Sequence, residues 1–546
     1  MKLIVEDLLK RFSALEEQRS SWDSHWAEVA EIVWPQADQF FDSQRQPGDK
    51  RTAKQYDMTA ALALDKFSAI YQSMNTPRTQ RWQRLVAADP DLQKLDHVKA
   101  WLEKLTRALF RLREVPRSNF YGAMGEAAKS IGAFGNQCVY TEEDPKTGLW
   151  RYKHCHIGQV FIDVDNHGLV DTVYRRFPMT AKAAEQQWGI DLLPGKIRIA
   201  LEKAPHTTFQ FLRIVIPRKD RDIGMPGPMG RPYASIDVSI EDKEQIGKEG
   251  GYHEFPFHYG RFGQNPTEKY GRGPAMMVLP DIKTLQEQEK TMLRSAHKAA
   301  DPPLLVNDDG ILGSGANSVN LAPGEITYGG VDSNGRQLVQ PLVSGARPDI
   351  TLEMQNKKRE TINNAFWVTL FQILVDQPGT QTATEVLERA QEKGQLIAPA
   401  IGRNQDEVLG PMTEREVGFL LRSNPGLMED IPQELIEANG EYDIQYDTPA
   451  TRMQRSEELL GIARTIELAQ PFIAVDPGIL DTIDGEEVIR VSAEITGMPT
   501  RVLRSKEDVA EMRAARAEAQ QQQQVLEHAG ELAGAAKDMG MEAPVG

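Results

Sequence analysis

The stretch 280-PDIKTLQEQEKTMLRSAHKAA-300 decides how this chain of 546 residues is organised. Pro280 suits the first turn of an α-helix, where the missing N–H of proline costs no hydrogen bond. The residues at 301–303, Asp-Pro-Pro, cannot continue a helix and force it to stop. At ~1.5 Å per residue, a helix with these limits is roughly 31 Å long. The stretch therefore predicts one long helix that carries charges of both signs.

A second long helix is predicted beyond a short insert. Residues 303–346 are typical of strands and turns, with turn signals at 308–310 (Asp-Asp-Gly) and 323–324 (Pro-Gly). Helical character returns at Pro348 and extends to about residue 374. The middle of this helix, 354–361, is polar nearly all round, so it gains little from packing on its own domain. We therefore expect neighbours on both of its flanks, as in an assembly.

The N-terminal side of this helix pair is predicted to be helical first and mixed afterwards. Trp22, Trp26, Val29 and Val33 recur at helical spacing and share one helix face. Further helices are predicted at about 53–74, 92–112 and 116–131. Short runs rich in Val, Ile, Phe and Tyr then indicate an α+β module, with strands at 137–141, 160–164, 170–177 and 209–215 and helices at 181–188 and 196–202. Thr180 is placed to cap the first of these two helices.

The C-terminal side is predicted to be helical and acidic. A loop at 376–382 precedes a helix that opens with Thr382 and Glu385 at capping-box spacing. A second pair with this spacing, Thr413 and Glu416, is predicted to start another helix. Residues 455–546 contain 17 acidic and 9 basic residues, and the part after about residue 520 is expected to be a disordered tail.

The charge and the cysteine content exclude several classes of protein. The formal net charge is −16 at pH 7, whereas proteins that wrap nucleic acid usually carry a basic excess. Any DNA is therefore expected to meet local patches or to pass without being gripped. Two cysteines, Cys138 and Cys155, exclude a disulfide scaffold and fit a reducing compartment. Neither a signal peptide nor an apolar stretch of about 18 residues is found, so we expect a cytoplasmic protein without a membrane span.

No motif for covalent or metal chemistry stands out. The Gly-Lys pairs at 195–196 and 247–248 are followed by Ile and Glu, whereas a phosphate-binding loop needs Ser or Thr there. The sequence at 154–156, His-Cys-His, places its two histidines on one face of a strand, but a zinc site needs three or four converging ligands. We therefore predict no catalytic residue, no metal site and no cofactor.

Several short stretches, taken together in their order, indicate a family. They are 270-YGRGPAMMVLPDIK-283, 381-QTATEV-386, 401-IGR-403, 409-LGPM-412, and 74-MNTP-77 followed by Arg81 and Trp82. Over most of the chain, to about residue 500, this arrangement resembles the podovirus-type portal proteins, the phage head-to-tail connectors. The resemblance implies a predominantly helical α+β fold. It also implies assembly into a ring, usually a dodecamer, around a DNA channel at one capsid vertex.

The resemblance further divides the chain into the regions of a portal. The wing would comprise the helical N-terminal part and the α+β module at 1–265, together with helices at 385–450. The other regions would be the approach to the stem and first stem helix at 266–300, the clip at 301–347, the second stem helix at 348–375, the tunnel loop at 376–384, and an acidic helical crown with its tail at 451–546.

Residues in three of these regions are implied to make functional contacts. In the tunnel loop, the residues that would face DNA are Gln377, Thr380, Gln381 and Thr382. On the stem, the residues that would contact a neighbouring subunit are Lys283, Glu287, Lys290, Arg294, Lys357, Lys358 and Arg359. In the clip, the residues that would dock partners are Asp308, Asp309 and Glu325.

The implied function is structural rather than enzymatic. The protein would nucleate capsid assembly in the host cytoplasm, remain in the virion, and form the channel for packaging and ejection of double-stranded DNA. Its implied partners are the terminase large subunit, the major capsid and scaffolding proteins, and tail adaptor proteins, with no membrane. One alternative is a cytosolic multidomain DNA-processing enzyme, which would need a carboxylate cluster for metal ions that cannot be assembled from the sequence. Another is a different structural scaffold.

Overall fold

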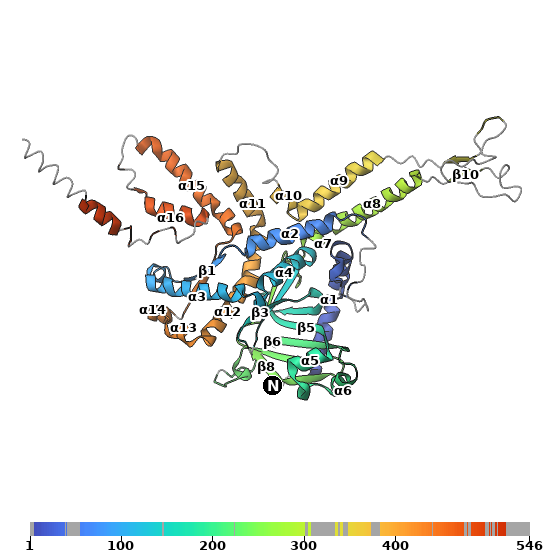
Figure 1. Cartoon of the computed structure of the whole chain (residues 1–546), viewed down its shortest axis with the longest axis horizontal. Coiled ribbons are helices and arrows are strands. Elements are labelled where there is room, and N and C mark those ends of the chain that lie inside the picture. Colours follow the sequence, from blue (N-terminus) through green and yellow to red (C-terminus); the bar gives the residue numbers. More distant parts are fainter. Residues whose placement is uncertain are drawn as a thin grey trace, which may run out of the picture. The chain divides into compact units, whose positions relative to one another are not determined.

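Two compact units make up the chain, as seen in the computed structural model (Figure 1). Unit 1 contains Met1–Thr380 and Gln395–Thr451, and unit 2 contains Gln381–Gly394 and Arg452–Gly546. The structure describes residues 5–38, 40, 48, 55–144, 147–222, 224–300, 304–306, 334–336, 339–341, 348–372, 383–438, 440–473, 478, 482–496, 502, 504, 508–509 and 511–519. Of the helices in these ranges, none is both long enough and apolar enough to cross a membrane.

Four long helices build the N-terminal layer of unit 1: α1 (Val5–Val33), α2 (Thr59–Asn75), α3 (Asp96–Glu114) and α4 (Phe120–Phe134). The predicted helices are confirmed, although α2 begins at Thr59 rather than near residue 53. Trp26, Val29 and Val33 are buried along α1, as their spacing predicts. Asn119 precedes α4 with a left-handed φ of 57° and so separates it from a short 3-10 turn at Pro116–Ser118.

Gly135 follows α4 and lets two backbone segments cross very closely. Its φ is +70°, and a Cβ built on it would lie 2.3 Å from the backbone nitrogen of Gly273. The Asn136 amide holds the crossing together, since it donates to the carbonyl oxygen of Gly271 and accepts from the Gly271 N–H, each at 2.8 Å. The close approach of the two backbones therefore explains the glycines in the stretch 270-YGRGP-274.

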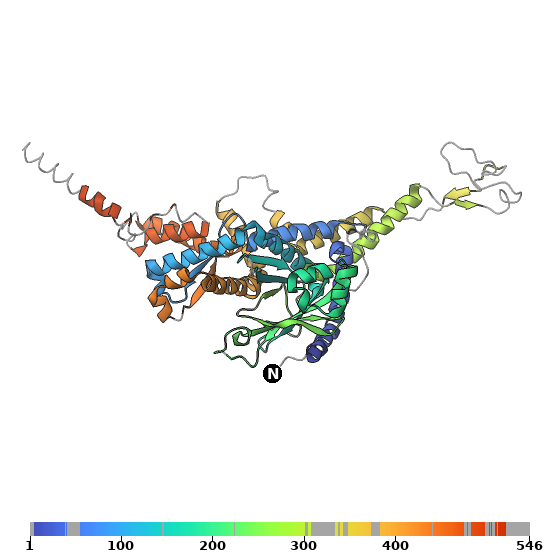
Figure 2. The same ribbon diagram turned by 60° about the horizontal axis from the view of Figure 1, so that its bottom comes forward.

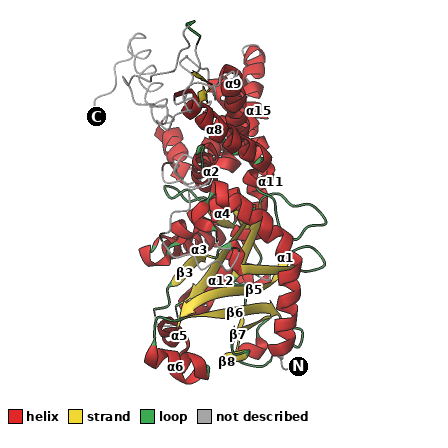
Figure 3. Ribbon diagram, turned by 90° about the vertical axis from the view of Figure 1, so that its right-hand side faces the viewer, coloured by secondary structure: helices red, strands yellow, loops and turns green. Residues whose placement is uncertain are grey.

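A five-stranded antiparallel sheet forms the centre of the α+β module, with strand order β4-β5-β6-β7-β8. Its strands are β4 (Val160–Val164), β5 (Val170–Thr180), β6 (Thr208–Pro217), β7 (Tyr233–Ser239) and β8 (Glu244–Tyr252). The first half of α1 covers one face, where Phe12 packs with Leu212 and Ile214 (Figure 3). Because β6 is covered on both faces, it is almost continuously apolar.

The opposite face of this sheet carries two short helices and a second sheet. The helices are α5 (Ala181–Trp188) and α6 (Gly195–Lys203), which pack around Phe211. The predicted cap of α5 is confirmed, since the Thr180 hydroxyl accepts from the Ala183 N–H at 3.3 Å. The second sheet has three strands in the order β3 (Trp150–His154), β2 (Asn136–Glu143) and β9 (Phe257–Arg261).

The two long helices lie side by side and extend away from the body of unit 1 (Figures 1 and 2). They are α8 (Leu279–Ala300), preceded by α7 (Pro274–Met277), and α9 (Pro348–Ala365). At the far end, β10 (Leu304–Val306) pairs antiparallel with β11 (Val339–Pro341). We call α8 and α9 together the stem hairpin, and its tip is the end next to β10.

The predicted single helix over 348–375 is wrong at one point. The chain leaves the helix at Phe366 and Trp367 and continues as α10 (Val368–Gln372). Trp367 has a left-handed φ of 60°. Phe366 is fully buried, and the Trp367 ring lies 5.1 Å from Phe67 and 5.5 Å from Phe262. These aromatic contacts with α2 and with the end of β9 compensate for the broken helix.

Residues 383–423 form one continuous helical segment, and this overturns the second predicted capping box. α11 (Ala383–Asn404) passes through a π-helical segment, Gln405–Leu409, directly into α12 (Gly410–Ser423). Thr413 lies inside α12, where its hydroxyl donates to the Leu409 carbonyl oxygen at 2.8 Å, and the Glu416 carboxylate is committed to another element. The helical segment ends at Ser423 and is followed by α13 (Pro425–Glu429) and α14 (Gln433–Glu437). β12 (Tyr442–Tyr446) pairs with β1 (Gln83–Ala87).

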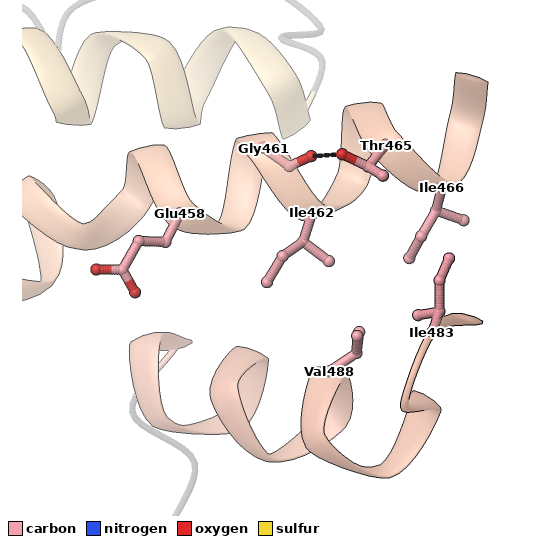
Figure 4. Close-up of a pocket in the computed structure, with 7 residues that line it drawn as sticks. All are labelled: Glu458, Gly461, Ile462, Thr465, Ile466, Ile483 and Val488. Atoms are coloured by element: carbon pink, nitrogen blue, oxygen red, sulfur yellow. Dashed lines mark hydrogen bonds between the residues drawn. The ribbon is translucent and has the colours of Figure 1, made fainter. Parts of the chain in front are cut away.

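Unit 2 is mostly helical where it is described, as the sequence predicts for this region. Its helices include most of α15 (Pro449–Ile473) and all of α16 (Gly485–Thr496). Between them lies a shallow, mainly apolar cavity of about 380 Å³ (Figure 4). It is lined by Glu458, Gly461, Ile462, Thr465, Ile466, Ile483 and Val488. The tail predicted after residue 520 lies outside the described residues.

Candidate functional site

The sequence-predicted site residues divide into those the structure describes and those it does not. The clip residues Asp308, Asp309 and Glu325 lie outside the described residues. The tunnel-loop residues also lie outside them; these are Gln377, Thr380, Gln381 and Thr382. All seven stem residues are described, and the candidate site is therefore built from the stem hairpin.

The root of the stem hairpin is anchored in the core of unit 1. Ile282, Leu285 and Ile362 are buried in its main apolar cluster. Gln286 adds polar contacts at the root, since its side-chain carbonyl oxygen accepts from the backbone N–H groups of Tyr56 and Asp57 at 2.6 and 3.0 Å. Its amide also donates to the Asp57 carbonyl oxygen at 2.6 Å. The direction in which the hairpin leaves the body is therefore set by contacts within one chain.

Two of the predicted inter-subunit cations pair across the hairpin, between α9 and α8. The Lys358 ammonium lies 2.5 Å from the Asp281 carboxylate on α8. The Arg359 guanidinium pairs with Asp57 at 3.0 Å and also with Glu289 on α8. These ion pairs are partly buried between the two helices, so Lys358 and Arg359 hold α9 against α8.

The remaining predicted stem residues lie largely on exposed surface. Lys283 pairs loosely with Glu28 on α1 at 2.8 Å, with both side chains about half exposed. Glu287 accepts from Lys290 at 2.9 Å, which is an ordinary pair one turn apart. Arg294 on α8 and Lys357 on α9 are exposed. The structure thus brings the seven residues together on one hairpin but divides them between its inner contact and its outer surface.

Sequence analysis missed a buried charged cluster that joins three elements of unit 1. Arg113 on α3 donates to the Glu416 carboxylate on α12 at 2.6 and 3.2 Å, and both side chains are fully buried. Tyr152 on β3 donates to the same carboxylate at 2.5 Å. Burial alone would lower the pKa of Arg113, but the adjacent Glu416 carboxylate holds it above its usual value.

A signal for this cluster was present in the sequence. Glu416 shares a helix face with Met412, Phe419 and Leu420, all of which are buried. A carboxylate on an apolar helix face requires a buried cation as its partner. The capping-box interpretation led us to overlook a buried partner for Glu416, because it placed this residue in an exposed first turn of a helix.

A second arginine ties the helical segment 383–423 to the sheets. Arg261 at the end of β9 donates twice to the Glu407 carboxylate, at 2.7 and 3.0 Å, and its backbone N–H donates to the same carboxylate at 2.8 Å. Glu407 lies in the π-helical segment between α11 and α12. The guanidinium binds Oε1 and the backbone N–H binds Oε2, so both carboxylate oxygens are held and the geometry is fixed more firmly than by a single contact.

The His-Cys-His sequence at 154–156 is part of the core. Burial lowers the pKa of His154 to about 3 and that of His156 to about 4, so both imidazoles are neutral at pH 7. His156 uses Nδ1 to accept from the Gly158 N–H at 3.1 Å. Among the described residues, no group of three or more His, Cys, Asp or Glu side chains is placed to hold a metal ion.

Comparisons with known proteins agree over nearly the whole length. Residues 5–503 match the family described as bacteriophage head to tail connecting protein. The portal protein of Salmonella phage epsilon15 is 28% identical over 533 residues, which cover 95% of this chain and 92% of that protein. The probable portal protein of Bordetella phage BPP-1 is 26% identical over 525 residues, covering 94% and 91%. A solved structure, the neck of an empty GTA particle computed with C6 symmetry, matches 73% of this chain and 84% of its own at a TM-score of 0.32 and 11% identity.

Proposed function

Because this chain belongs to the family of bacteriophage head-to-tail connecting proteins, we propose that it forms the dodecameric channel through which double-stranded DNA enters and leaves a phage capsid. Its role is that of a structural portal of a tailed phage, and it is a component of the virion. Portals act as ring oligomers with capsid and tail partners. The finer proposal adds nucleation of capsid assembly in the host cytoplasm and successive docking of terminase and tail adaptor proteins.

One observation carries this proposal beyond the family assignment. The stem hairpin is anchored at its root by Ile282, Leu285 and Gln286, yet most of its length is not covered by the rest of unit 1. The outer side of α9 is polar and stays exposed at Glu353, Lys357 and Glu360. Identical neighbours in a ring would cover the exposed flanks and close the assembly around a channel.

We propose for this chain the regions of a portal that the resemblance implies. The wing would comprise 1–265 and 385–450, with the stem on 266–300 and 348–375 and the clip on 301–347 between them. The tunnel loop would occupy 376–384, and the crown with its tail would occupy 451–546. A net charge of −16 per subunit suits a channel that lets DNA slide rather than one that binds its phosphates.

Electron microscopy of the purified full-length chain tests the proposal directly. We expect closed rings with a central hole, usually of twelve subunits, and no nuclease activity in the presence of magnesium. Monodisperse monomers that cut DNA with magnesium would instead favour a DNA-processing enzyme and would remove the basis of the channel assignment.

The tunnel loop yields a prediction about DNA movement. The loop at 376–382 has no basic residue, so Gln377 and Gln381 could touch DNA only through weak, sequence-independent hydrogen bonds. We expect the double change Gln377→Lys with Gln381→Lys to leave ring assembly intact and to slow DNA packaging. The slowing should increase as salt is lowered, because lysine would pair with backbone phosphates.

The measurement is the rate of DNA packaging into proheads at low and high salt. Changing the same two residues to asparagine is the control, since it keeps the loop polar and uncharged. Packaging rates that match the control at both salt concentrations would show that this loop does not meet DNA.

A further inference from the structure

The exposed surface of α8 carries a stripe of alternating charge. Lys283, Glu287 and Lys290 follow one another at helical spacing, with Lys283 and Glu287 exposed and Lys290 partly exposed. The stripe lies away from the side of α8 that carries the buried Ile282 and Leu285. We call these three residues the α8 flank.

The exposed surface of α9 carries a second stripe of this kind. Glu353, Lys357 and Glu360 are exposed and also recur at helical spacing. They lie opposite the side of α9 that carries the buried Gln355 and Ile362. We call these three residues the α9 flank.

The two flanks are complementary when they are compared along the hairpin. Since α8 faces α9 through Asp281–Lys358 and Glu289–Arg359, each flank lies on the outer side of its helix. From the tip to the root, the α8 flank runs positive, negative, positive, ending with Lys283. Over the same stretch of the hairpin, the α9 flank runs negative, positive, negative, ending with Glu360.

We propose that the α8 flank of one copy of this chain packs against the α9 flank of the next copy, with Lys290 facing Glu353, Glu287 facing Lys357 and Lys283 facing Glu360. The inference rests on the proposed ring and adds which surfaces meet and in which register. In a ring, neighbours are related by rotation about the ring axis, so their hairpins lie side by side with tips and roots level. A head-to-tail contact of two different flanks is what a closed ring requires.

The same charge pattern disfavours the wrong pairing. Each flank has the same order of signs when it is reversed end to end. If two α8 flanks met in a two-fold dimer, Glu287 would therefore face Glu287 and cations would face cations, whichever way the helices ran. Two α9 flanks would meet with the same repulsion around Lys357. The pattern thus selects against isolated dimers and in favour of ring growth.

The ion pairs that the flank residues form within one chain do not prevent them from pairing with a neighbouring copy. Lys283 is paired with Glu28, both about half exposed (45% and 52%). Glu287 is paired with Lys290 inside the α8 flank itself, with side chains 71% and 25% exposed. Exposed ion pairs of this kind are weak and are readily rearranged. Lys358 and Arg359 differ, because they hold the hairpin itself together.

A charge exchange on the full-length chain tests the register. We expect Lys357→Glu to raise the protein concentration needed for half-assembly by roughly tenfold at low salt, since every interface then places Glu287 against a glutamate. Glu287→Lys alone should have a similar effect. The double variant, Glu287→Lys with Lys357→Glu, should recover assembly, as should an equal mixture of the two single variants, because an alternating ring has only matched interfaces.

Sedimentation velocity, with electron microscopy of the main species, provides the readout at low and high salt. Lys182→Glu on the exposed face of α5 is the control, because it changes the net charge equally and lies away from both flanks. If the wild type forms no ring, the proposed function fails. If the wild type forms rings but Lys357→Glu assembles like the control, or the mixture gains nothing over the single variants, the register is wrong and the portal assignment stands.

Discussion

Replacing Glu416 with alanine is expected to destabilise the wing by about 3–5 kcal/mol, because it leaves the buried Arg113 guanidinium without a counter-ion. The Tyr152 hydroxyl would lose its acceptor at the same time. Arg113 also lies 4.8 Å from the Trp82 ring, and it could not reach water without disturbing that contact. The loss should appear as a lower urea midpoint, followed by tryptophan fluorescence.

Two controls separate this effect from the general cost of an alanine substitution. Glu103 pairs with Arg107 at 2.6 Å on the exposed surface of α3, so Glu103→Ala should cost no more than about 1 kcal/mol. Removing both charges together, with Arg113→Met and Glu416→Leu, should recover most of the lost stability, since no buried charge is then left unpaired. If Glu416→Ala unfolds at the same urea concentration as Glu103→Ala, the cluster does not stabilise the wing.

Replacing residues 307–342 with a short Gly/Ser linker is expected to abolish DNA packaging while the rest of the chain still folds. This segment lies between the two stem helices, beyond the root contacts of Ile282, Leu285 and Ile362 that anchor the hairpin. Because those contacts are untouched, the wing and the stem should keep their structure. If the segment is the clip, its loss removes the surface on which terminase docks.

The experiment requires a measure of assembly beside the measure of packaging. Circular dichroism and electron microscopy of the purified variant should show folded rings, and a terminase pull-down should show that binding is lost. The asparagine variant of Gln377 and Gln381 is a suitable control, since its changes lie outside 307–342. Normal packaging by the clip variant would contradict the assignment of 301–347 as the docking region.

The local order of the chain could be predicted well from the sequence. Pro280 and the run Asp-Pro-Pro at 301–303 enclose α8, and helical spacing identified the buried face of α1 through Trp26, Val29 and Val33. The Thr180 cap and the limits of α5 were also predicted correctly. These features depend on residues that are only a few positions apart, so they can be predicted from the sequence pattern.

Contacts between residues far apart in the chain could not be predicted in this way. The helix breaks at Trp367, whose ring packs against Phe67 and Phe262. The local sequence at 366–367 does not indicate these two contacts, because both partners are far away in the chain. The spacing of Thr413 and Glu416 matches a capping box, but Glu416 instead forms an ion pair with Arg113, 303 residues away in the sequence. The pair forms because a buried cation needs a counter-ion. Likewise, the sequence marks Lys357, Lys358 and Arg359 as equal cations on a polar helix. The packing of α9 against α8 places Lys358 and Arg359 in ion pairs between the two helices and leaves Lys357 exposed. Only the tertiary structure could decide this, because burial and distance, rather than residue type, determine which charges can pair.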